Sequence, residues 1–183
     1  GEDKMNITVY LGASEGFDPI YKNKVIELGH WIGNHGHTLV YGGSKTGLMG
    51  ELAHSVLNTG GKVIGVEPQF FIDQEVQLTT LTQLIITKDM PERKTKMIEL
   101  GDVFIAFPGG TGTLEEISEV MTKSALKQID APCVIYNLNG YYDDLQALLK
   151  KMVDEGFSTL EKQKNFYFIK DLNELKEIIE NED

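Results

Sequence analysis

Short apolar runs rich in β-branched and aromatic residues recur along the chain, and longer stretches of helical periodicity separate most of them. The runs are mostly continuous rather than alternating, a pattern typical of strands that are covered on both faces. They predict about seven strands, over residues 7–11, 38–41, 62–66, 84–87, 103–107, 133–138 and 166–169.

Between these runs, apolar side chains repeat three or four residues apart, which predicts helices over residues 19–33, 114–126, 145–153 and 172–179. Another helix is expected to begin near Pro91, because proline favours the first turn. Strands that alternate with helices favour a parallel sheet with right-handed crossovers. The expected fold class is therefore α/β, a doubly wound parallel sheet with helices on both faces. Residues 67–83 break the alternation, and there we expect a short helix and a loop at the rim of a site.

The composition limits what such a fold can do. A length of 183 residues suits one domain, so residues 1–183 are interpreted as a single nucleotide-binding domain, with residues 1–4 expected to be disordered or vector-derived. A net charge of −11 opposes binding to DNA or RNA backbones. No apolar stretch is long enough to span a membrane, and because the first predicted strand begins so early we expect no signal peptide. The single cysteine cannot form an internal disulfide, and we expect a cytoplasmic protein.

Candidate binding residues gather at one edge of the predicted sheet. In sheets of this kind, ligands bind beyond the carboxyl ends of the strands. Glycines and small hydroxyl residues follow the first strand, at residues 12–14, and the second strand, at residues 42–44. The fourth strand leads through Met90 to Arg93, and the fifth leads into residues 108–113. We therefore expect the ligand at this edge.

The segment PGGTGTLEE, at residues 108–116, is the strongest single signal. A strand runs into a glycine-rich turn and then into a helix, so that backbone N–H groups and the helix N-terminus form a cradle for a phosphate. The alternative is a tight turn that binds nothing. Known phosphate fingerprints do not match, because GGSKTGLMG lacks a Lys-Ser/Thr pair after its second Walker-type glycine and GASEG is not GxGxxG.

Glu116 allows two interpretations. Thr113 and Glu116 have the spacing of a capping box, in which the carboxylate bonds back to the N–H of the capping residue. Spacing alone favours that structural role. The functional alternative is a carboxylate held beside a phosphorylated ligand. Glu115 and Glu119 are expected to be solvated or in ion pairs.

Arg93 is the single arginine among the 17 basic residues of the chain. The position after Pro91 places it near a helix N-terminus, where a cation is unfavourable. A residue that breaks such a local preference without an evident gain in stability often marks a functional site. The planar guanidinium also binds phosphate or carboxylate in a way that lysine cannot. The alternative is a surface arginine paired with Glu92 or Glu99. Position and uniqueness favour a function.

Other chemically capable side chains give weaker signals. His35 and His37 lie in a glycine-containing turn and are expected to be solvated. His30 and His54 have no partners at metal-ligand spacing. Cys133 lies in an apolar strand and is interpreted as a small core residue. No Ser/His/Asp or Cys/His/Asp arrangement can be assembled.

Three motifs in this order, YGGSKTGLMG, DMPERK and PGGTGTLEE, resemble those of the LOG ("Lonely guy") family. The resemblance extends from the first strand to about Gly156 and includes NLNGYYDDL and VDEGF. Members are cytokinin riboside 5′-monophosphate phosphoribohydrolases, often mislabelled as possible lysine decarboxylases. The resemblance implies a Rossmann-like parallel sheet and a homodimer or larger homo-oligomer whose active site lies near the dimer interface.

Motif matching assigns expected roles to individual residues. The resemblance implies that Arg93 and Glu116 act together as the catalytic pair on the glycosidic bond. No cofactor and no metal are expected. The candidate substrate-binding residues lie in the glycine turn, after the first two strands and beside Arg93: Ser14, Gly42, Gly43, Met90, Lys94, Gly109, Gly110, Thr111, Gly112 and Thr113.

The chain also departs from the family pattern. Pro91 stands where many members have His, Thr111 where many have Tyr, and Ser44 where many have a third glycine. The segment KSALKQID, at residues 123–130, replaces the usual Trp-Ala-Gln-Leu-Gly run. That replacement lies where it would change the base pocket or the dimer contacts.

The sequence indicates one function, leaves one alternative and argues against a third. The resemblance implies hydrolysis of the N-glycosidic bond of an N6-modified adenosine 5′-monophosphate, giving free base and ribose 5-phosphate. A nucleotide- or cofactor-binding module without turnover is the alternative, and the Arg93/Glu116 pair argues against it. A lysine decarboxylase is rejected, because that chemistry needs pyridoxal phosphate on a lysine and no lysine lies in an identifiable cofactor motif.

Overall fold

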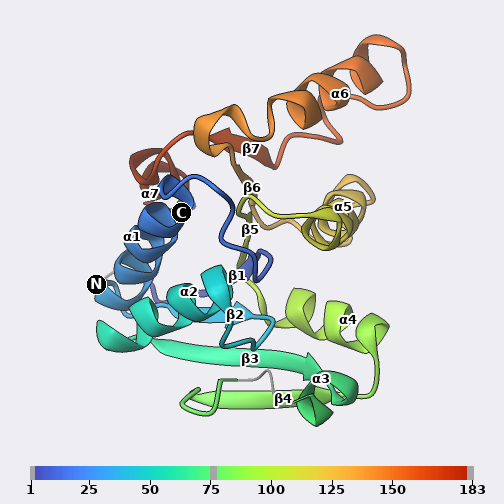
Figure 1. Cartoon of the computed structure of the whole chain (residues 1–183). Helices are drawn as coiled ribbons and strands as arrows, with labels where there is room; N and C mark the ends of the chain where they lie inside the picture. Colours follow the sequence, from blue (N-terminus) through green and yellow to red (C-terminus); the bar gives the residue numbers. More distant parts are fainter. Residues whose placement is uncertain (1–2, 75–77, 181–183) are drawn as a thin grey trace.

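The computed structural model describes residues 3–74 and 78–180, and these form an α/β fold around one parallel sheet (Figure 1). All neighbouring strands run parallel, in the order β4-β3-β2-β1-β5-β6-β7. The strands are β1 (Asn6–Tyr10), β2 (Thr38–Tyr41), β3 (Lys62–Pro68), β4 (Gln83–Thr87), β5 (Val103–Ala106), β6 (Cys133–Tyr136) and β7 (Phe166–Ile169). The predicted strands and the doubly wound, Rossmann-like fold class are thereby confirmed.

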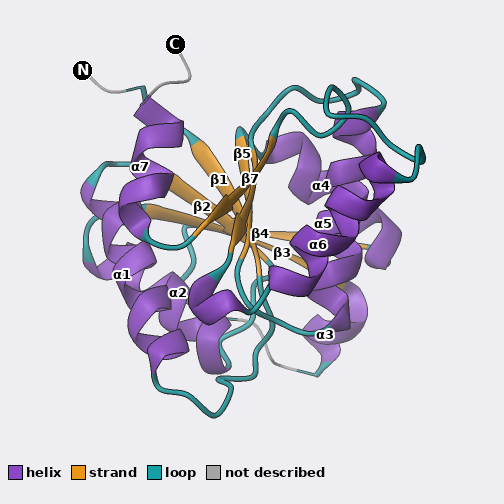
Figure 2. Cartoon of the chain, turned by 90° about the horizontal axis from the view of Figure 1, so that it is seen from above, coloured by secondary structure: helices purple, strands orange, loops and turns teal. Residues whose placement is uncertain are grey.

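Helices cover both faces of the sheet (Figure 2). They are α1 (Ile20–Asn34), α2 (Gly47–Asn58), α3 (Gln69–Asp73), α4 (Met90–Leu100), α5 (Thr111–Ala125), α6 (Asp143–Asp154) and α7 (Leu172–Glu180). A short 3₁₀ turn, η1 (Leu138–Gly140), follows β6. The helices α1, α2 and α7 pack on one face of the sheet, and α4, α5 and α6 pack on the other.

Two apolar cores explain why the strands are continuously hydrophobic. Ile105 belongs to the core under α1 and α2, whereas its neighbour Phe104 belongs to the core under α4 and α5. Successive side chains of a strand point to opposite faces, so a strand between two helical layers must be apolar at every position. Cys133 lies fully buried in the second core, as predicted.

The strand order places a switch point between β1 and β5. From β1, the chain moves outward through β2, β3 and β4, and it then returns to add β5, β6 and β7 on the other side. Loops that leave the carboxyl ends of two such strands separate in opposite directions and leave a crevice between them. The ends of β1 and β5 are therefore where a ligand site is expected.

The irregular stretch after β3 contains the predicted short helix, α3. Beyond it, the N–H of Leu78 donates a hydrogen bond to the carbonyl oxygen of Gly43, at 2.9 Å, which ties this stretch to the end of β2. Residues 75–77 of the expected loop lie outside the described residues.

Two other expectations concern residues that precede strands: the start of the chain, before β1, and His37, before β2. Residues 1–2 lie outside the described part of the chain, whereas Asp3 and Lys4 are described as exposed and irregular. The expectation that His37 is solvated was wrong, because it is buried, packs on Trp31 and accepts a hydrogen bond from the Met5 N–H at 3.1 Å. Among the helices that the structure describes, none is long and apolar enough to cross a membrane.

Candidate active site

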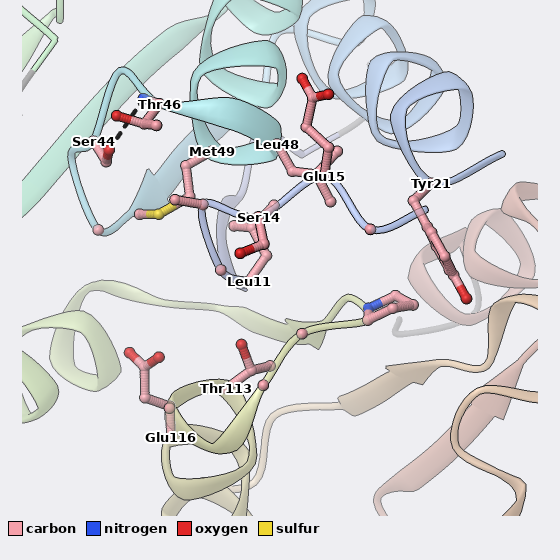
Figure 3. A pocket seen from close by; sticks show the side chains of 18 of the residues that line it. Leu11, Ser14, Glu15, Tyr21, Ser44, Thr46, Leu48, Met49, Thr113 and Glu116 are labelled. Carbon is pink, nitrogen blue, oxygen red and sulfur yellow. Dashed lines mark hydrogen bonds between the residues drawn. The ribbon is translucent and has the colours of Figure 1, made fainter. Parts of the chain in front are cut away.

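A pocket of about 690 Å³ lies at the carboxyl ends of the strands, at the switch point. Its walls come from the loops after β1, β2 and β5, the first turns of α2 and α4, and the N-terminal half of α5. Figure 3 shows Thr113 and Glu116 on α5 across an open space from Leu11, Ser14 and Met49.

Most of the residues predicted from sequence line this pocket. They are Ser14, Gly42, Met90, Arg93, Gly109, Gly110, Gly112, Thr113 and Glu116. The other three predicted binding residues, Gly43, Lys94 and Thr111, are not among its lining residues. The Lys94 ammonium forms ion pairs with Glu115, at 2.8 Å, and with Glu119, at 3.7 Å, as expected for those two carboxylates.

Arg93 is held inside the protein by the start of α4. The Asp89 side chain caps this helix by accepting a hydrogen bond from the Glu92 N–H at 3.0 Å, and Pro91 occupies its first turn. Arg93 is only 8 % exposed, and its Nη1 contacts the Met90 sulfur at 3.6 Å. Within residues 3–74 and 78–180, no carboxylate lies within 4.0 Å of the guanidinium, and its buried Nε has no hydrogen-bond partner. The surface ion pair that was the alternative is therefore not formed.

Gly42 is a glycine because Arg93 lies against it. A β-carbon at position 42 would lie 1.8 Å from Arg93 Nη2 and 2.6 Å from the Met49 methyl carbon. No side chain fits there while the guanidinium keeps its place, so the missing side chain of Gly42 makes room for Arg93 at the pocket wall.

The capping-box interpretation of Glu116 was wrong. The helix α5 begins at Thr111 with Gly110 as its N-cap, three residues before Thr113, which a capping box would require as the N-cap, and no side chain caps it. The Thr113 Oγ1 is buried without a hydrogen-bond partner among the described residues. Because glycine adopts the cap conformation without a side chain, the helix starts early, and Glu116 lies in its second turn facing the pocket.

Burial changes the acid–base behaviour of Glu116. Desolvation raises the pKa of this carboxyl from 4.5 to about 7, and the positive charge of Arg93 opposes the rise. A carboxyl with a pKa near neutrality exchanges a proton readily at physiological pH, which is what a general base or acid requires. The pocket therefore holds a titratable carboxyl and a fixed cation together.

The N-terminus of α5 presents backbone N–H groups without a competing side-chain acceptor. Two tyrosines after β6 brace the turn in front of it. The Tyr142 hydroxyl donates to the carbonyl oxygen of Phe107 at 2.8 Å, and the Tyr141 hydroxyl donates to that of Gly109. A braced glycine turn at a helix N-terminus is suited to bind an anion.

Comparison with known proteins shows which family has a sequence similar to this chain. A family described as "Possible lysine decarboxylase" matches residues 49–179. The cytokinin riboside 5′-monophosphate phosphoribohydrolase of Rhodococcoides fascians is 43% identical over 155 residues, which cover 84% of this chain and 78% of the relative. The chain belongs to the LOG family.

Other relatives give the same assignment. The phosphoribohydrolase LOG1 of Arabidopsis thaliana is 42% identical over 82% of this chain and 71% of its own length. Among solved structures, the molybdenum cofactor binding protein of Rippkaea orientalis matches with a TM-score of 0.72 at 22% identity, covering 98% of both chains. The molybdenum cofactor carrier protein of Chlamydomonas reinhardtii matches with a TM-score of 0.68 at 22% identity, covering 98% of this chain and all of its own. At this identity the two structures show a shared fold alone.

The pocket of this LOG-family chain also contains residues that the sequence analysis missed. Glu67, Phe71, Met49, Tyr21 and Tyr141 all line it. Two of these had a detectable signal: Tyr141 lies in the NLNGYYDDL segment, and Glu67 is a charged residue at the end of an apolar strand. The other three come from helices α1, α2 and α3, whose approach to the pocket depends on the packing of the whole fold.

Proposed function

We propose that this chain hydrolyses the N-glycosidic bond of an N6-modified adenosine 5′-monophosphate and releases the free base and ribose 5-phosphate. The observation that carries the proposal is that Arg93 and Glu116 line one pocket with the glycine turn of α5. The names of relatives with about 40% identity support the same reaction and substrate class.

The glycine turn is suited to the 5′-phosphate. The free N–H groups at the start of α5 and the positive end of its helix dipole would bind the phosphate without a lysine. The unpartnered Thr113 hydroxyl, buried at the same helix end, supplies one more donor. This binding mode fits a chain with a net charge of −11, because the attraction for the anion is local.

The reaction replaces the bond between the sugar C1′ and the base nitrogen with a bond from C1′ to a water oxygen. The sugar passes through a cation that resembles an oxocarbenium ion. The ionised Glu116 carboxylate would stabilise that cation and take the proton from the attacking water. The departing base would take up a proton from solvent, and Glu116 would then return its own proton to solvent. Arg93 would position the nucleotide and favour the ionised form of Glu116, since its charge lowers the pKa of that carboxyl.

One experiment separates this enzyme from a binding module without turnover. The purified protein is incubated with AMP and with isopentenyladenosine monophosphate, and free base and ribose 5-phosphate are measured. Equal amounts of the two products support the proposal. Tight nucleotide binding by calorimetry with no product would favour the binding module instead.

We also propose that the protein assembles as a homodimer or larger homo-oligomer. The helix α5, which carries Glu116, exposes the apolar side chains of Leu114 and, at its C-terminal end, Leu126. A second copy covering these residues would lie close to the pocket. Light scattering coupled to gel filtration measures the mass directly, and a monomer at micromolar concentration contradicts the proposal. The cytoplasmic location stays a prediction.

A further inference from the structure

Glu67 is a buried carboxylate that the proposed mechanism does not use. It lies near the carboxyl end of β3, is only 1 % exposed and lines the pocket. Its Oε2 has no hydrogen-bond partner in the part of the chain that the structure describes. An unpartnered buried carboxylate is costly, so such a group at a pocket wall indicates a ligand that completes its hydrogen bonds.

Two consecutive glycines place Glu67 beside Arg93. A β-carbon on Gly43, where φ is +87°, would lie 2.6 Å from the Glu67 Cγ, just as one on Gly42 would overlap the guanidinium of Arg93. The Arg93 charge is close enough to lower the pKa of Glu67, which burial raises to about 6. No oxygen of Glu67 lies within the 4.0 Å ion-pair distance of Arg93 in residues 3–74 and 78–180. An acceptor and a donor, Glu67 Oε2 and Arg93 Nε, therefore remain unpartnered at one pocket wall.

The chemistry of these two groups restricts what can bind between them. A phosphate only accepts hydrogen bonds at neutral pH and would be repelled by the carboxylate. An exocyclic amino group donates well to a carboxylate but accepts nothing from a guanidinium. A hydroxyl group does both, because its hydrogen is donated and its oxygen accepts.

A nucleotide carries hydroxyl groups on its sugar, and the 2′-hydroxyl is on the carbon bonded to C1′, the carbon whose positive charge Glu116 is proposed to stabilise. We propose that Glu67 accepts a hydrogen bond from the 2′-hydroxyl of the nucleotide, with Arg93 donating to the same oxygen, so that the protein selects ribonucleotides over 2′-deoxyribonucleotides. The identity of the ligand rests on the proposed function. In glycoside hydrolysis, hydrogen bonds at this hydroxyl strengthen in the transition state, so the contact contributes to kcat as well as to binding.

The test is a comparison of AMP with 2′-deoxy-AMP in the wild type, Glu67→Gln and Glu67→Met. The ratio of the two kcat/KM values is measured for each protein, so the intrinsic reactivity difference between the two nucleotides cancels. We expect the ribose preference to fall by about tenfold or more in Glu67→Met, since a hydrogen bond to a charged group is lost, and to fall less in Glu67→Gln, whose amide oxygen still accepts. If Glu67→Met does not fold, the change in Glu67→Gln decides. An unchanged ratio in the folded variants overturns the proposal.

Two controls make the outcome specific. Glu119→Gln removes the charge of another carboxylate whose buried Oε2 makes no hydrogen bond and forms only a long ion pair with Lys94, at 3.7 Å. Glu119 is not among the lining residues, so this variant should leave the ratio unchanged. The 5′-monophosphate of purine riboside lacks the amino group of adenine. If Glu67→Met abolishes discrimination against that nucleotide and leaves the ribose preference intact, Glu67 binds the base and the proposal is wrong.

Binding measurements distinguish a failure of this inference from a failure of the proposed function. Calorimetric Kd values for AMP and 2′-deoxy-AMP give the same ratio without turnover. Absence of product in the wild type would refute the hydrolase, whereas loss of ribose preference on binding in Glu67→Met would still support the contact. Equal ratios in wild type and variants by both methods refute the contact alone.

Discussion

Replacing Glu116 with glutamine should remove activity and at the same time make the protein more stable at alkaline pH. Glutamine keeps the shape of the side chain and removes its charge. The folded state raises the pKa of this carboxyl from 4.5 to about 7, mainly because burial disfavours the charged form. The ionised carboxylate therefore opposes folding, and the neutral amide does not.

The magnitude follows from the pKa shift. Between pH 4.5 and about 7 the folded protein binds more protons at this site than the unfolded chain does, so stability falls as pH rises through that window. At about 1.4 kcal/mol per pKa unit, the shift corresponds to a cost of about 3 kcal/mol above pH 7. Glu116→Gln should therefore raise the free energy of unfolding by about 3 kcal/mol at pH 8 and by about 1 kcal/mol at pH 5.5.

Urea denaturation at the two pH values measures both differences. The matched control is Glu115→Gln, whose carboxylate is 66% exposed and pairs with Lys94 on the surface. That variant should lose at most about 1 kcal/mol, because exposed ion pairs contribute little. A Glu116→Gln protein that is no more stable than the wild type at pH 8 would show that burial of the ionised carboxylate does not destabilise the folded state.

Two further substitutions test how Arg93 is held and what it does. Arg93→Gln removes the charge that lowers the pKa of Glu116, so the acidic limb of the pH profile of kcat/KM should move to higher pH. The rate should also fall about a hundredfold or more. An acidic limb that stays in place would contradict the electrostatic coupling between Arg93 and Glu116. Gly42→Ala places a β-carbon 1.8 Å from Arg93 Nη2, so the guanidinium must move, and activity should fall up to about a hundredfold with a stability loss of about 1–3 kcal/mol in denaturation. Full activity in Gly42→Ala would mean that the position of the guanidinium is unimportant.

The strands could be predicted from sequence because of their environment. Each lies between two helical layers, so continuous apolar runs such as residues 103–107 mark both the strand and its burial on two faces. Ligands in such sheets bind beyond the carboxyl ends of the strands, which predicted that Ser14, Gly42, Arg93 and the glycine turn lie in one region. All of them line the pocket.

Local sequence patterns did not predict the surroundings of a side chain where these depended on tertiary packing or on the exact start of a helix. The spacing of Thr113 and Glu116 could not show that α5 starts at Thr111, because glycine caps leave no side-chain signature. Glu67 faces the pocket only because β3 pairs with β2 in a register that brings it against Gly43. His37 is buried because the turn after α1 brings it against Trp31, a contact that turn composition does not reveal.

The release of free base from isopentenyladenosine monophosphate, by wild type and Glu116→Gln side by side, tests the central claim most directly. The wild type should release base and ribose 5-phosphate in equal amounts, and the folded Glu116→Gln variant should do so about a hundredfold more slowly or not at all. Full activity in the variant, or no free base from the wild type, would contradict the assignment of this pocket to glycosidic hydrolysis.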